Sequence, residues 1–125
     1  GRLLPSVIGA LLKGEEARCS HGRQLRDFIH VEDVAGALLH LLAGRQSGAF
    51  NIGNGLPHAL REAVDHLAHA LGRPHLLRYG ALAAGSNEPA LLVADVERLR
   101  STGWQSRFDL PRGLDDTLAW WQAQV

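Results

Sequence analysis

Four stretches of this 125-residue chain place apolar side chains at helical spacing, and short β-prone runs separate them. Helices are expected over residues 3–12, 32–42, 59–71 and 110–121, with a shorter one from Asp95 to Gly103. The helix over 32–42 is expected to bury Val34, Leu38, Leu41 and Leu42. Extended runs are expected over residues 16–20, 25–31, 49–52 and 76–79. Because strands alternate with helices and no linker or repeat intervenes, the sequence predicts one α/β domain over residues 1–125.

Composition excludes several classes of protein. The 13 Lys and Arg residues balance 13 Asp and Glu residues, so no basic excess favours a nucleic-acid partner. The apolar stretch over 3–12 ends at Lys13 and is too short to span a bilayer, so no membrane partner is expected. A single cysteine excludes an intrachain disulfide and a four-cysteine zinc site. With no targeting segment, a cytoplasmic location is the default expectation.

The chain contains no methionine, so Gly1 is not a native initiator. The first ten residues mix apolar positions with Arg2, Pro5 and Ser6, unlike a signal peptide. We therefore expect this chain to be a piece of a longer protein.

A glycine turn at 53–55 follows a predicted strand and precedes a helix, as in a dinucleotide fingerprint. His58 stands where the third glycine would be, and no acidic residue follows about twenty positions later. The turn is therefore interpreted as a structural link. Ala59 begins the next helix without a capping side chain, which we expect to cost about 1 kcal/mol.

Other reactive side chains are interpreted as structural. His66 and His69 lie on one side of a helix, where charge pairs with Glu62 and Asp65 are favoured over a metal site. Cys19 is interpreted as a small, partly buried residue. Tyr79 has no lysine four residues later, so a Tyr-Lys pair at helical spacing is absent.

The stretch from Arg26 to Asp33 is the most informative one. It places an arginine at the start of an extended run that leads directly into a helix. A guanidinium group there suits a diphosphate or carboxylate ligand. The alternative is a surface pair of Arg26 with Asp27, with Asp33 as a helix-start carboxylate.

Residues 26–34 (RDFIHVEDV) closely resemble the RDFIHVxDxA signature of the NAD-dependent epimerase/dehydratase family, the extended short-chain dehydrogenase/reductases. Further resemblances follow in the family's order. They are the RLLP segment at 2–5, FNIGNG at 50–55, the stretch from 80 to 95 and the closing GW and LPRGL motifs within 103–114. The whole chain thus resembles the C-terminal substrate-binding portion of these enzymes.

The resemblance implies a nucleotide-sugar ligand and assigns roles to individual residues. Arg26 matches the arginine that contacts the substrate diphosphate, and Glu88 matches the acid that binds the ribose hydroxyls. Four further positions match residues near the nucleotide: Arg2, Leu3, Arg18 and Cys19. His30 and Asp33 are expected to be structural.

The resemblance also implies a reaction and partners for a longer parent protein. That parent is expected to be an NAD(P)-dependent epimerase, dehydratase or 4-ketoreductase acting on nucleotide sugars. NAD or NADP would bind mainly to a Rossmann domain that is missing here, and a homo-oligomer is possible. The family's glycine-rich phosphate loop and Tyr-x-x-x-Lys pair are absent, so no residue of this chain is assigned a catalytic, cofactor or metal role and the chain alone is expected to lack oxidoreductase activity.

One departure concerns the substrate itself. Gly85 stands where relatives usually carry an arginine for the phosphates, three residues before Glu88. An alternative function is therefore a stand-alone, non-catalytic binding or interaction module derived from this family.

Overall fold

The computed structural model describes residues 2–125. Helices and strands follow one another in this order: α1 (Leu3–Lys13), β1 (Ala17–Arg18), β2 (Leu25–Arg26), α2 (Val31–Ala43), β3 (His58–Ala59), α3 (Leu60–Ala70), the single 3-10 turn η1 (Pro74–Leu76), β4 (Leu77–Arg78), β5 (Leu91–Leu92), α4 (Glu97–Arg100) and α5 (Leu110–Ala123). The predicted α/β class is confirmed. Within the described residues, no helix combines the length and the apolar character needed to cross a membrane.

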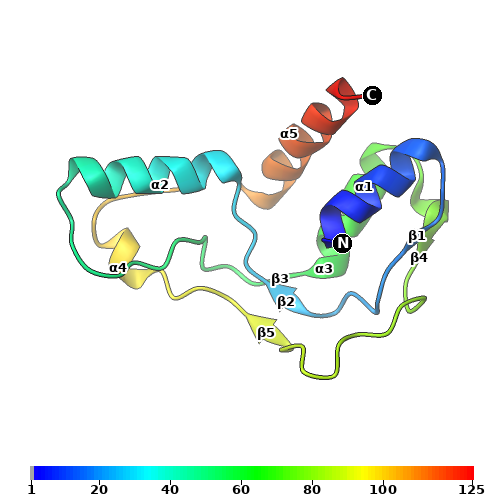
Figure 1. The fold of residues 1–125 in the computed structure, drawn as a ribbon, viewed down its shortest axis with the longest axis horizontal. Coiled ribbons are helices and arrows are strands. Elements are labelled where there is room, and N and C mark those ends of the chain that lie inside the picture. Colours follow the sequence, from blue (N-terminus) through cyan, green and yellow to red (C-terminus); the bar gives the residue numbers. More distant parts are fainter. Residues whose placement is uncertain (1) are drawn as a thin grey trace.

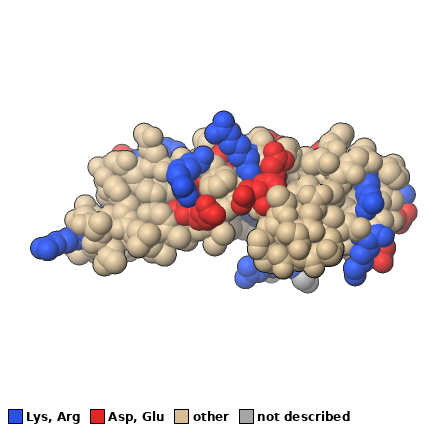
Figure 2. All heavy atoms as spheres, turned by 90° about the horizontal axis from the view of Figure 1, so that it is seen from above, with Lys and Arg blue, Asp and Glu red and all other residues tan. Residues whose placement is uncertain are grey.

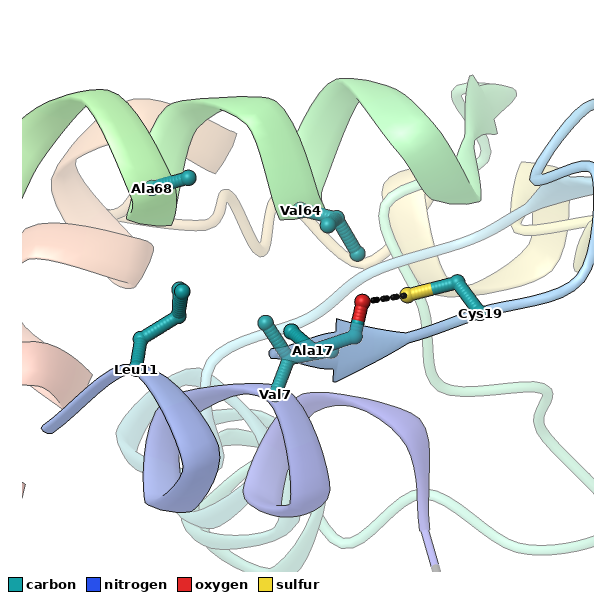
Figure 3. Close-up of a cluster of buried hydrophobic side chains, with 6 residues drawn as sticks. All are labelled: Val7, Leu11, Ala17, Cys19, Val64 and Ala68. Atoms are coloured by element: carbon teal, nitrogen blue, oxygen red, sulfur yellow. Dashed lines mark hydrogen bonds between the residues drawn. The ribbon is translucent and has the colours of Figure 1, made fainter. Parts of the chain in front are cut away.

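Three helices, α1, α3 and α5, form the main body of the molecule (Figure 1). Val7 and Leu11 of α1 face Val64 and Ala68 of α3, with β1 beside them (Figure 3). A second cluster joins α1 and α3 to the apolar face of α5, and its buried members are Ile8, Ala63, Leu67, Leu114 and Leu118. The predicted apolar faces of these helices therefore form the core.

Two small sheets border this body. β1 pairs in parallel with β4, and Ala17 lies opposite Leu77, sixty residues further along the chain. β2 is central in the second sheet, antiparallel to β3 and parallel to β5. The predicted extended runs contain β1, β2 and β4 but neither β3 nor β5, which pair with β2 through contacts more than thirty residues apart in sequence.

The start of α3 shows how the missing cap at Ala59 is replaced. No side chain accepts a hydrogen bond from the first turn of this helix. Instead, the N–H groups of Leu60 and Arg61 donate to the carbonyls of Gln24 and Gly22, both at 2.9 Å. Backbone carbonyls that precede β2 thus satisfy the first turn of α3 and fix these residues against it.

Helix α2 extends away from the main body (Figure 1). The prediction that its apolar stripe forms core is wrong for Leu38 and Leu42, which are 55% and 76% exposed. The buried residues of α2 are Asp33 and Ala37. The segment leading to α5 covers the side of α2 that carries these two residues. Along the opposite side, which carries Leu38 and Leu42, no described helix or strand is packed. Seen from above, the α2 end is mostly uncharged, and charges of both signs gather where α2 meets α5 (Figure 2).

Residues 49–52 were predicted to be a strand, and that prediction is wrong. A strand needs a neighbour to pair with, and the Ala49 carbonyl instead accepts a hydrogen bond from Arg98 at 2.6 Å. The same guanidinium lies over the Phe50 ring, 4.4 Å from its centroid. A side chain from α4 therefore occupies the place of a partner strand.

Candidate substrate-recognition site

Arg26 lies in the central strand of the β3–β2–β5 sheet, opposite His58 and Leu92. The Nη2 atom of Arg26 is 3.2 Å from Oε1 of Glu88. The Nη1 atom donates a hydrogen bond to the backbone carbonyl of the preceding residue, Leu25. The Arg26 side chain is 16% exposed, so the guanidinium is held close to the sheet but remains accessible. The two residues that the family resemblance assigns to the diphosphate and the ribose are therefore in direct contact.

Glu88 stands on the loop between β4 and β5. Its backbone N–H donates to the Gly85 carbonyl, which closes a tight turn. Its second oxygen, Oε2, accepts a hydrogen bond from Nε2 of Gln24 at 3.1 Å. Both carboxylate oxygens are thus held by side chains, one from β2 and one from the residue before it, and the Glu88 side chain is still 31% exposed.

A pocket of about 340 Å³ adjoins this carboxylate. Polar side chains line one wall, and the loop before β5 lines the other; the lining residues are His21, Arg23, Gln24, Ala84, Gly85, Glu88 and Ala90. His21 accepts the Arg23 N–H through Nδ1 at 2.9 Å, which fixes the turn at the pocket's edge. The pocket therefore offers donors and acceptors next to the Arg26–Glu88 pair.

The alternative pairing of Arg26 with Asp27 is wrong, because Asp27 holds the glycine turn instead. Its carboxylate accepts the N–H groups of Asn54 and Gly55 at 2.9 and 2.8 Å. A Cβ at Gly53 would lie 2.6 Å from Asp27 Oδ2, so glycine is needed there for close approach. The turn is thus a structural link, as predicted.

The contact of Asp27 with the glycine turn also bears on whether this turn can bind the phosphates of a dinucleotide. A phosphate-binding glycine loop presents free backbone N–H groups to the anion. Here the Asn54 and Gly55 N–H groups donate to Asp27, whose negative charge would repel a diphosphate. The residues of this turn therefore do not fit NAD or NADP.

Arg18 and Cys19 differ in their surroundings. The Arg18 side chain is exposed and donates to the Ala81 carbonyl at 3.3 Å, at the start of the loop that carries Glu88. Cys19 is 2% exposed and lies in the core, with its thiol directed to the Ala17 carbonyl (Figure 3). Burial raises the pKa of the Cys19 thiol, and the nearby charge of Asp65 adds to this.

Arg2 and Leu3 lie at the start of α1. Arg2 is exposed and precedes the helix, and Leu3 packs against the cluster shared by α1 and α3. Among the hydrogen bonds and ion pairs of residues 2–125, none links Arg2 or Leu3 to Arg26 or Glu88. Their assignment to the nucleotide stays a prediction.

His30 is structural, as expected. His30 Nδ1 accepts the Glu32 N–H and caps α2, so Nε2 carries the proton and donates to Asp116 at 2.8 Å. The His30 ring also stacks on Phe108 with centroids 4.0 Å apart. The residue therefore ties the start of α2 to α5.

The His66 and His69 interpretation needs one correction. Neither forms the predicted pair with Glu62 or Asp65 side chains; His66 instead bonds Asp115 of α5 at 2.7 Å. His69 Nδ1 contacts the Asp65 backbone carbonyl. Within residues 2–125, no three His, Cys, Asp or Glu side chains converge as a metal site would require.

Gln24 is the functional candidate that sequence reasoning missed. Side chains two residues apart in an extended chain point to the same side, so Gln24 and Arg26 share a face. That alternation was the available signal. It could not show which loop residue the shared face meets, because Glu88 is 64 residues away from Gln24.

Comparison with known proteins relates the sequence of this chain to a family. The family model described as the NAD dependent epimerase/dehydratase family matches residues 1–53. CDP-abequose synthase of Salmonella typhimurium is 29% identical over 124 residues, which cover 94% of this chain and 42% of that protein. UDP-glucose 4-epimerase of Halalkalibacterium halodurans is 31% identical over 100 residues, 76% of this chain and 29% of that protein.

Solved structures show the same fold. MoeE5 in complex with UDP-glucuronic acid and NAD is 34% identical with a TM-score of 0.81, covering 95% of this chain and 40% of that one. The dTDP-glucose 4,6-dehydratase of Bacillus anthracis in complex with NAD is 22% identical with a TM-score of 0.86, covering 98% and 39%.

The resemblance drawn from the sequence motifs is confirmed. The fold and the sequence matches place this chain among the extended short-chain dehydrogenase/reductases. Within that class it is a homologue of the NAD-dependent epimerase/dehydratase family, whose relatives include nucleotide-sugar epimerases and dehydratases. The chain spans 42% or less of the length of the curated relatives named above.

Proposed function

We propose that this chain is the substrate-binding part of an NAD(P)-dependent enzyme that epimerises, dehydrates or reduces a nucleotide sugar. The observation that carries the proposal is the contact of Arg26 with Glu88 beside the pocket of about 340 Å³. Arg26 would bind the diphosphate, and Glu88 would accept hydrogen bonds from the ribose hydroxyls.

The chemistry of a nucleoside diphosphate supports this assignment. Its diphosphate is attached to C5′ of the ribose, so a cation for the phosphates and an acceptor for the 2′ and 3′ hydroxyls belong to the same site. Arg26 Nη2 and Glu88 Oε1 are 3.2 Å apart, and each side chain has exposed surface on which a ligand can form new hydrogen bonds. A guanidinium fork matches phosphate oxygens in geometry as well as charge.

Arg18 supports the same site indirectly. By donating a hydrogen bond to the Ala81 carbonyl, it helps to fix the beginning of the loop that carries Glu88. The remaining assignments, Arg2, Leu3 and Cys19, extend the proposed nucleotide site along α1 and β1. For Cys19, the core position allows a ligand contact only after the loop beyond β4 moves, since both its thiol and its backbone N–H are engaged within the protein.

We further propose that groups outside these 125 residues carry out hydride and proton transfer. Tyr79, the one tyrosine, donates its hydroxyl to Arg61 O and to the Asp65 carboxylate. Burial and the Asp65 carboxylate raise its pKa well above the usual range, which opposes formation of a tyrosinate. The one lysine, Lys13, ends α1. This chain's contribution would be binding energy that positions the sugar.

The exposed face of α2 is proposed as the contact surface for a dinucleotide-binding domain. Val31, Leu38, Leu39 and Leu42 on this helix are all more than half exposed. A contiguous apolar surface of this kind marks an interaction site. When that domain is absent, we expect a second copy of the chain to cover the same face, so the isolated chain should self-associate through it.

The proposed substrate class is tested by calorimetric titration of the protein with UDP, CDP and dTDP, and with uridine as a ligand that lacks phosphate. We expect Arg26→Ala to weaken diphosphate binding by about ten- to a hundredfold, because one charge-assisted hydrogen-bond donor set is lost. Arg112→Ala is the matched control, since that side chain is 77% exposed on α5. Equal affinities of the two variants, or no binding of any diphosphate by the wild type, would overturn the proposal.

A further inference from the structure

We infer that Gln24 is a positioning residue that orients the Glu88 carboxylate for recognition of the ribose hydroxyls. The inference rests on the proposed function of Glu88 and extends it to a residue that makes no direct contact with the ligand. It concerns which sugar the nucleotide carries, ribose or a deoxygenated analogue.

The two oxygens of Glu88 are held by different donors. Gln24 Nε2 lies 3.1 Å from Oε2, and Arg26 Nη2 lies 3.2 Å from Oε1. With only one of these contacts, the carboxylate would be free to rotate about the oxygen that is held. Together they fix its plane, so the lone pairs left free by Gln24 and Arg26 point in a defined direction.

Gln24 is itself held rigidly. Gln24 is only 4% exposed. Its Nε2 atom also donates a hydrogen bond to Ser20 Oγ at 3.2 Å. Its backbone carbonyl accepts the Leu60 N–H at the start of α3. Gln24 therefore connects a rigid helix to the loop that carries Glu88.

The orientation of the Gln24 amide is fixed by the acceptor that it faces. Gln24 Oε1 is buried and has no hydrogen-bond partner. Reversing the amide would bring Oε1 against the Glu88 carboxylate, acceptor to acceptor, so only the observed orientation is allowed. A buried unpaired carbonyl is unfavourable. The contact with Glu88 thus sets the orientation of the amide and leaves Oε1 without a partner.

This geometry predicts a selective effect on the ligand. Loss of the Gln24 N–H leaves Arg26 and its phosphate contact in place but releases Glu88 to rotate. The hydroxyl contribution to binding should fall, and the diphosphate contribution should remain. A residue that mattered only for folding would weaken both alike.

The test compares UDP with 2′,3′-dideoxy-UDP, because relatives of known structure carry UDP sugars. We expect Gln24→Met, which keeps the length but removes the donor, to lower the preference for UDP about tenfold, as for one lost charge-assisted hydrogen bond. Affinity for the dideoxy ligand should stay within about twofold of the wild type. The double variant with Glu88→Gln and Gln24→Met should prefer UDP over the dideoxy ligand as much as Glu88→Gln alone does, because Gln24 acts through Glu88.

A second variant guards against a folding defect. Gln24→Glu keeps the shape and places a carboxylate against Glu88. At about pH 7.5 the two charges repel and the preference for UDP should be lost, and at about pH 5 a shared proton should partly restore it. Both ligands carry the same diphosphate, so their affinity ratio cancels its titration.

The outcomes separate this inference from the proposed function. If the wild type binds neither ligand, the proposed function fails. If it prefers UDP and Gln24→Met keeps that preference, or loses affinity for both ligands equally, the positioning role is wrong and the proposed function stands. A ligand-free check is the double-mutant cycle of Gln24 and Glu88 in unfolding free energy, where zero coupling would also overturn the inference.

Discussion

The Asp33 carboxylate accepts the backbone N–H of Phe108 at 3.0 Å, and this contact ties α2 to the segment before α5. Asp33 is 2% exposed, and its other oxygen accepts the Arg107 N–H at 2.9 Å. A side chain from the first turn of α2 thus serves two backbone donors that lie about 75 residues away.

We expect Asp33→Ala to lower the free energy of unfolding by on the order of 3 kcal/mol, because two backbone N–H groups lose a buried, charged acceptor. Asp33→Asn keeps one acceptor oxygen and should cost less. The matched control is Glu32→Ala on the same turn, whose side chain is 57% exposed and whose removal should change stability by less than about 0.5 kcal/mol. Urea unfolding of the three variants measures this, and equal stabilities would show that the Asp33 contacts are weak.

Tyr79 should titrate abnormally. Its raised pKa means that the folded state favours the neutral phenol. The stabilisation is fully present below the unfolded pKa of about 10 and is lost as the pH rises from there towards the folded pKa. Because the chain has one tyrosine, absorbance near 295 nm reports this group alone.

We expect no tyrosinate signal from the folded protein at about pH 10, where half of an unperturbed tyrosine would be ionised. Tyr79→Phe should lose about 1 kcal/mol at neutral pH and should not show the alkaline loss of stability assigned to this phenol. A half-point near pH 10 in the folded wild type would contradict the buried contact with Asp65.

Much of the fold could be predicted from the sequence because its signals are local. Gly14 ends α1 in a left-handed conformation, and the spacing of Val64 and Leu67 gives the buried face of α3. The strand at 49–52 failed because its pairing depends on a neighbour, and Arg98 satisfies the Ala49 carbonyl instead. The exposed α2 face failed for a similar reason, because periodicity shows which side is apolar but not what covers it.

The candidate site was predictable only in part. Motif resemblance named Arg26 and Glu88, but their contact joins positions 62 residues apart and required the pairing of β2 with β5. Gln24 was missed because its partner lies on an irregular loop. Residue spacing predicts neighbours within one helix or strand, whereas this site combines β2 with the loop before β5.

Gly85 offers a gain-of-function test. A Cβ there would meet only Glu88 Cβ at 3.7 Å, an ordinary contact, so the backbone accepts a side chain. We expect Gly85→Arg to tighten UDP binding by about tenfold at low salt and by less at high salt, since the added cation acts through a screened interaction. Gly85→Ala is the control for the backbone change, and unaltered affinity in Gly85→Arg would place the diphosphate away from this turn.

The α2 face should control self-association of the isolated chain. Leu42 is 76% exposed and Leu38 55%, and the α2 end of the molecule carries little charge on the face that Figure 2 shows. We expect Leu42→Glu to leave the free energy of unfolding within about 0.5 kcal/mol of the wild type, because no buried contact is lost. The same change should reduce the sedimentation coefficient at high protein concentration by removing an apolar contact between copies. Leu82→Glu is the matched control, being 49% exposed on the loop after β4 and outside this helix. Equal sedimentation of both variants and the wild type would mean that the α2 leucines mediate no contact between copies of this chain, and the dinucleotide-binding domain would remain as their proposed partner.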